Sequence, residues 1–210
     1  MQSLNRRIIG IDFDNTIVNY NELIYSTARH RGLIPAGVVK NKKEIRDAVR
    51  KLPDGEIEWQ RLQAFIYGKG MENAVLMDGV ADFFDLCKRL NVPAFIVSHK
   101  TQFASMDLQR VDLRQTALQW MKTNKFFSQD GFGLALDNVY FESTRQGKIN
   151  SLRALGCAYF IDDLEETFLE PSFPSEVEKI LFNPQGPDIH IANVKIFQSW
   201  QEINGYLFRK

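Results

Sequence analysis

The chain has 210 residues, and its 26 lysine and arginine residues balance its 26 aspartate and glutamate residues, so the formal net charge is zero. This balance excludes a protein that attracts nucleic acid or an anionic membrane through its overall charge. The hydrophobic fraction of 44% and the charged fraction of 25% are typical of globular proteins and exclude extensive disorder. We therefore expect one substantial core with room for a small inserted module.

The sequence shows no sign of membrane targeting. Its first residues, MQSLNRRIIGID, lack the apolar segment of a signal peptide, and no later run approaches the roughly 18 apolar residues of a membrane span. We expect a cytoplasmic protein with neither a membrane nor a nucleic acid as partner, and the oligomeric state stays open. Cys87 and Cys157 have no CxxC spacing and are expected to be small core residues.

Short apolar runs rich in β-branched and aromatic residues alternate with patterns of helical period, which is typical of an α/β fold with a parallel sheet covered on both faces. The expected strands, in chain order, are residues 8–12, 94–98, 139–142, 158–162 and 179–183. The expected helices are residues 42–52, 56–67, 80–90, 107–123 and a segment that begins at Lys148.

Residues 18–77 interrupt this alternation, because they contain no convincing strand. Their charged windows predict helices joined by PAG and PDG turns. We expect a helical module of residues 18–77 inserted into a core formed by residues 1–17 and 78–210.

Ligands of parallel α/β sheets bind at the carboxyl ends of the strands. Polar residues follow four of the expected strands: Asp12, Asp14 and Thr16 after the first, Ser98 at the second, Lys148 after the third, Asp162 and Asp163 at the fourth. Carboxylates so close together repel one another unless they share a cation. Oxygen ligands suit a hard divalent cation, and so few carboxylates favour Mg²⁺ before Ca²⁺. The lysine and the hydroxyl groups would donate to phosphoryl oxygens. The pattern predicts a phosphoryl-transfer site.

The order DFDNT, Ser98, Lys148, FIDD resembles the four motifs of the haloacid dehalogenase-like (HAD) hydrolase superfamily, from Ile8 to about Leu164. The resemblance implies a Rossmann-like parallel sheet in three α/β/α layers, with the inserted module as a small helical cap. It also implies that Asp12 is a nucleophile that forms an aspartyl-phosphate, and that Asp14 is the general acid and base.

The resemblance further implies the binding residues. Magnesium would be bound by the Asp12 carboxylate, by the backbone carbonyl of Asp14, and by an acidic residue of the FIDD motif. Asp163 is the first choice for that residue, whereas Asp162 would bind through water or orient Lys148. The residues expected to hold phosphoryl oxygens are Thr16, Ser98 and Lys148.

A carboxylate at Asp14 favours phosphate esters over carbon–halogen bonds, because an alkoxide leaving group needs a proton and a halide does not. We expect a magnesium-dependent phosphatase, a phosphoric monoester hydrolase, acting on a small phosphorylated metabolite such as a sugar phosphate or nucleotide. A phosphotransferase or phosphomutase with the same intermediate is one alternative, and a metabolite-binding protein without turnover is another. The structural alternative is that these aspartates only cap strand ends and helices.

Overall fold

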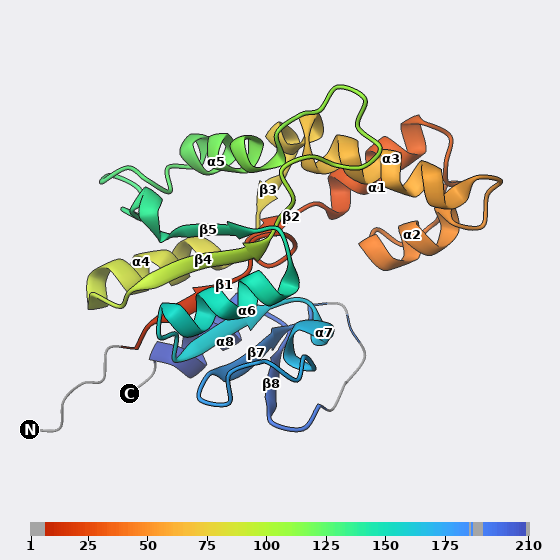
Figure 1. Ribbon diagram of the computed structural model, residues 1–210. Helices are drawn as coiled ribbons and strands as arrows, with labels where there is room; N and C mark the ends of the chain where they lie inside the picture. Colours follow the sequence, from red (N-terminus) through yellow and green to blue (C-terminus); the bar gives the residue numbers. More distant parts are fainter. Residues whose placement is uncertain (1–6, 185, 187–190, 209–210) are drawn as a thin grey trace, which may run out of the picture. The chain divides into compact units, whose positions relative to one another are not determined.

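The computed structural model describes residues 7–184, 186 and 191–208 (Figure 1). By its internal contacts the chain divides into two compact units. One consists of Met1–Val18, Leu76–Lys100 and Asn124–Lys210, and the other of Asn19–Val75 and Thr101–Thr123.

The first unit is built on a six-stranded sheet. Its strands are β1 (Ile9–Ile11), β4 (Ala94–His99), β5 (Val139–Glu142), β6 (Tyr159–Asp162), β7 (Glu178–Phe182) and β8 (Val194–Phe197). They lie in the order β5-β4-β1-β6-β7-β8, and all five neighbouring pairs are parallel. Counted along the chain, this is the order 3-2-1-4-5-6 of a doubly wound sheet, whose switch point lies between β1 and β6.

Helices cover both faces of this sheet. They are α4 (Val80–Leu90), α6 (Arg145–Ala154), α7 (Glu165–Phe168) and α8 (Trp200–Phe208), with a short 3₁₀ turn, η2 (Leu136–Asn138). Leu181 of β7 belongs to an apolar cluster with Leu152 of α6 and Phe168 of α7. The next residue, Phe182, packs on Trp200 of α8 instead, with ring centroids 5.9 Å apart. Since successive strand residues face opposite ways, α6/α7 and α8 lie on opposite faces, which confirms the predicted α/β fold.

Gly10 lets α6 lie close to the central strand. A Cβ atom built on Gly10 would lie 2.9 Å from Leu152 Cδ2 and 3.0 Å from the Phe160 ring. Both distances are shorter than ordinary carbon contacts. The helix and the strand are therefore packed as closely as only glycine allows.

The second unit is helical. Its elements are α1 (Asn21–His30), α2 (Lys42–Val49), α3 (Gly55–Tyr67), η1 (Lys69–Asn73) and α5 (Leu113–Thr123). Residues 101–123, expected within the core, group by contacts with this unit, and the Trp120 indole donates to the Ala74 carbonyl at 2.9 Å. The two-residue strands β2 (Val18–Asn19) and β3 (Val75–Leu76) pair where the chain passes between the units.

Two predicted helix starts were wrong. The helix expected at 107–123 begins at Leu113, because the Asp107 side chain accepts the Val111 backbone N–H at 2.7 Å and holds the segment in a turn. The helix expected to begin at Lys148 begins at Arg145, after Thr144, whose hydroxyl accepts the Gly147 N–H at 2.9 Å as an N-cap.

The observed β1, β4, β5, β6 and β7 match the expected strands to within a residue at each end, whereas β8 was not predicted. Among the described helices, none has the length and apolar character that crossing a bilayer requires.

We expect the substitution Gly10→Ala to destabilise the first unit by about 1–3 kcal/mol, because the added methyl group overpacks the contact with α6. Urea unfolding measures this loss. Leu152→Ala removes the methyl groups that face Gly10. The double variant should therefore lose less unfolding free energy than the two single variants lose in sum. An unchanged unfolding midpoint in Gly10→Ala would contradict the close packing.

Candidate functional site

The segment DFDNT forms a tight loop directly after β1. The Asp12 N–H donates to the Ile161 carbonyl of β6 at 2.8 Å, and the Ile17 N–H donates back to the Phe13 carbonyl at 3.0 Å. Asn15 adopts a left-handed backbone with φ of 62°, which asparagine tolerates better than most residues. The loop thereby keeps Asp12 and Asp14 at the carboxyl end of the sheet.

Asp12 is held through one of its carboxylate oxygens. Its Oδ1 accepts hydrogen bonds from Lys148 Nζ at 2.6 Å and from the Ser98 hydroxyl at 2.9 Å. The three side chains come from the loop after β1, from α6 and from β4, and all three are buried. Within the described part of the chain, Oδ2 of Asp12 accepts no hydrogen bond. This second oxygen is available to a ligand.

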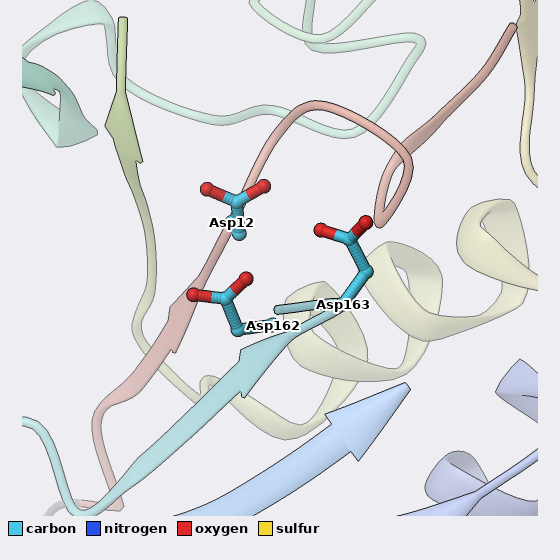
Figure 2. Close-up of side chains that lie close together, drawn as sticks. All are labelled: Asp12, Asp162 and Asp163. Carbon is cyan, nitrogen blue, oxygen red and sulfur yellow. The ribbon is translucent and has the colours of Figure 1, made fainter. Parts of the chain in front are cut away.

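Three acidic side chains gather at the switch point of the sheet. Asp12, Asp162 and Asp163 each offer a carboxylate oxygen, and these oxygens lie within 4.8 Å of one another (Figure 2). Asp162 is fully buried and already bonded: its Oδ2 accepts Lys148 Nζ at 2.7 Å, and its Oδ1 accepts the Leu164 N–H at 3.0 Å. Asp163, in contrast, is only partly buried.

The electrostatics of Asp12 reflect this crowding. Burial raises the pKa of Asp12 from its ordinary value of 3.8 to about 7, and the nearby charges of Asp162 and Asp14 add to the effect of burial. The attraction of Lys148 acts in the opposite direction but does not prevail. Burial alone would lower the pKa of Lys148, yet the two carboxylates Asp12 and Asp162 raise it, so this lysine stays charged.

A second buried lysine, Lys100, accompanies Asp14. Its Nζ lies 2.8 Å from Asp14 Oδ2 and 3.1 Å from Oδ1, and its side chain is 2% exposed. Sequence reasoning did not single out Lys100. The signal was present, because Lys100 follows Ser98 by two residues and a strand places such residues on the same side.

The charges of the site suit a divalent cation. When all are ionised, the four carboxylates of Asp12, Asp14, Asp162 and Asp163 outnumber the two ammonium groups of Lys100 and Lys148 by two charges. Oxygen ligands of this kind bind hard cations such as Mg²⁺. The Asp14 side chain lies outside the acidic trio, and the predicted role of its backbone carbonyl as a metal ligand stays a prediction.

The two hydroxyl groups expected to bind phosphate differ. The Ser98 hydroxyl donates to Asp12, whereas Thr16 Oγ1 is buried and has no hydrogen-bond partner among the described residues. The backbone of Thr16 is fixed, since its carbonyl accepts the Trp200 indole N–H at 3.0 Å. The phosphate-binding roles of Thr16, Ser98 and Lys148 stay predictions.

The substitution Lys148→Met should destabilise the fold by about 3–5 kcal/mol, because it leaves the buried carboxylates of Asp12 and Asp162 without their cation. The exposed Lys122 provides a matched control, since Lys122→Met should change the unfolding free energy by no more than about 0.5 kcal/mol. Urea unfolding of both variants tests the difference. Equal stability of Lys148→Met and wild type would show that the buried bridge contributes little.

Comparison with known proteins gives similarity in structure but not in sequence. No protein-family model matches the chain. No curated protein matches it either.

Solved structures with similar folds are HAD hydrolases and a dehalogenase. A haloacid dehalogenase-like hydrolase from Streptococcus pneumoniae is 17% identical with a TM-score of 0.58, and the match covers 95% of this chain and 97% of that one. A HAD family hydrolase from Deinococcus radiodurans, with bound phosphate and sodium, is 14% identical with a TM-score of 0.55, over 96% and 94% of the two chains. The dehalogenase is 13% identical with a TM-score of 0.57, over 100% of both. The chain thus has the fold of the HAD hydrolases, and at the level of the fold the resemblance carried by its four motifs is confirmed.

Proposed function

We propose that this chain is a magnesium-dependent phosphatase, which hydrolyses a small phosphorylated metabolite through an aspartyl-phosphate on Asp12. The observation that carries the proposal is the state of Asp12: one oxygen is held by Lys148 and Ser98, and the other accepts no bond from the described residues. An anchored carboxylate with one open oxygen, at the end of a central strand, has the arrangement that a nucleophile needs.

In this mechanism a carboxylate oxygen of Asp12 attacks phosphorus while the bond to the ester oxygen breaks. Asp14, two residues further along the loop, gives its proton to that ester oxygen, so the leaving group departs as an alcohol. Water then attacks the aspartyl-phosphate, Asp14 takes a proton from the water, and Asp12 is released together with inorganic phosphate. Throughout both steps Lys148 keeps a positive charge beside the reacting group.

The metal would be held by Asp12 and Asp163, together with the backbone carbonyl of Asp14. Asp162 is the weaker candidate for a direct ligand, because both of its oxygens already accept hydrogen bonds, from Lys148 and from Leu164 N–H. Its role is to orient Lys148. When bound, a magnesium ion would neutralise charge on the phosphoryl oxygens and fix their orientation.

Phosphate-ester chemistry is favoured over dehalogenation, although one structure with a similar fold is a dehalogenase. A halide leaves without a proton, whereas an alkoxide needs one. Asp14 is kept in the loop, partly exposed at 20% of its side-chain surface, and is tied to Lys100. A carboxyl group in this place can supply the proton that an alkoxide leaving group needs and that a halide does not.

The substitution Asp12→Asn should abolish magnesium-dependent phosphate release from p-nitrophenyl phosphate, by at least about 10³-fold, because the amide is a poor nucleophile. The exposed Asp137 provides the matched control, and Asp137→Asn should retain wild-type rates. Circular dichroism checks that both variants fold. Substantial turnover by folded Asp12→Asn would rule out the proposed nucleophile.

The neighbouring acids should differ in their effect on metal binding. We expect Asp163→Asn to weaken Mg²⁺ binding by roughly 100-fold, since a direct ligand is lost, and Asp162→Asn by about tenfold, since only a supporting partner is lost. Isothermal titration calorimetry on the purified variants measures both affinities. If the order were reversed, Asp162 would be the direct ligand.

A further inference from the structure

The mechanism above uses Lys148 but leaves the second buried lysine without a role. Lys100 is 3% exposed, and both oxygens of Asp14 lie within 3.1 Å of its Nζ. A buried ammonium group is costly unless a carboxylate compensates it. A cation kept at such a cost, at the edge of the proposed site, calls for an explanation beyond packing.

The two lysines serve different carboxylates. Lys148 Nζ bonds Asp12 at 2.6 Å and Asp162 at 2.7 Å, whereas Lys100 Nζ bonds Asp14 at 2.8 Å. The pairing follows the strands: Ser98 contacts Asp12, and two residues further on Lys100 contacts Asp14. The segment that follows β1 thus makes two successive contacts, with the end of β4 and with the residue just after it. Ser98 bonds the proposed nucleophile Asp12, and Lys100 bonds the proposed acid Asp14.

Lys100 is itself fixed from more than one side. Its backbone N–H donates to the Glu142 carbonyl of β5 at 2.8 Å, and its Nζ lies 5.5 Å from the centre of the Phe13 ring. Phe13, which lies between Asp12 and Asp14 in the sequence, is buried. Lys100 therefore has little freedom to follow Asp14 if that carboxylate turns.

We propose that Lys100 is the positioning residue of Asp14, holding its carboxylate in the orientation from which a proton passes to the leaving oxygen. The inference rests on the proposed phosphatase function and adds to it a device for poor leaving groups. The carboxyl proton of Asp14 moves to the ester oxygen as the oxygen–phosphorus bond breaks and the Asp12–phosphorus bond forms. Without Lys100 the partly exposed Asp14 side chain turns into solvent and the transfer loses its geometry.

The kinetic test compares p-nitrophenyl phosphate, whose leaving group hardly needs a proton, with benzyl phosphate, whose alkoxide does. In Lys100→Met, the single-turnover rate of benzyl alcohol release should fall by roughly 10²-fold, while the single-turnover rate of p-nitrophenol release and the half-saturating concentrations of both substrates change by less than about threefold. In an Asp14→Asn background the same substitution should add nothing further. Equal losses with both substrates, or a full further loss in the Asp14→Asn background, would overturn the proposal.

Lys100→Arg keeps a cation on the same strand and covers the case in which Lys100→Met does not fold. In Lys100→Arg, the ratio of the release rate from benzyl phosphate to that from p-nitrophenyl phosphate should stay within about threefold of wild type. A folded Lys100→Arg whose ratio lies about tenfold or more below that of wild type would contradict the role.

Crystal structures of wild type and of the Lys100 variants provide a test that needs no turnover. In Lys100→Met the Asp14 carboxylate should leave its wild-type position, and an unmoved carboxylate would refute the proposal even in an inactive protein. Failure of the proposed function is a separate result, namely no phosphate release by wild type with Mg²⁺.

Discussion

One buried ion triplet, Asp12, Lys148 and Asp162, constrains the rest of the candidate site. The bonds of 2.6 and 2.7 Å from Lys148 Nζ join the strands on either side of the switch point through a helix that lies on one face of the sheet. Charges withdrawn from water to this extent persist only when their partners are fixed in place. The distance between α6 and the sheet is therefore fixed.

Gly10 allows this distance to be short. Leu152 lies one helical turn after Lys148, so the two side chains share a face of α6. Leu152 Cδ2 lies 2.9 Å from the position that a Cβ of Gly10 would take, and Lys148 reaches Asp12, two residues after Gly10 and just past the end of β1. The close packing of α6 on Gly10 and the reach of Lys148 to Asp12 thus belong to the same contact between α6 and the segment of β1.

Much of this arrangement could be predicted from the sequence, because strand ends and the helical period are local signals. The five predicted strands and the four motifs placed Asp12, Ser98, Lys148 and Asp162 at one edge of a sheet, where the structure has them. The bonds of Asp162 to Lys148 and to the Leu164 N–H could not be predicted, since they depend on where β6 ends and on the position of α6. Lys100 was missed because a single lysine after a strand resembles any surface lysine until its burial is known.

Other errors have local physical causes. Residues 107–112 carry apolar residues at helical spacing, yet the Asp107 side chain accepts the Val111 N–H and holds the segment in a turn. The Asp112 side chain accepts the N–H groups of Arg114 and Gln115 in the first turn of α5, so the helix begins only there. The strand β8 pairs only with β7 at the edge of the sheet, and its residues are half-buried or exposed, so its sequence lacks the continuous apolar run of the inner strands. The grouping of residues 101–123 with the helical unit depends on contacts distant in sequence.

The indole of Trp200 holds the carbonyl of Thr16 across 184 residues of chain, and Lys148 reaches Asp12 across 136. During synthesis Asp12 therefore emerges from the ribosome well before Lys148, and Thr16 well before Trp200. Contacts of such long range form late, because a large loop must close first. A growing chain therefore holds Asp12 without its cation until α6 has emerged, and it holds the loop after β1 without the Trp200 hydrogen bond until α8 has emerged.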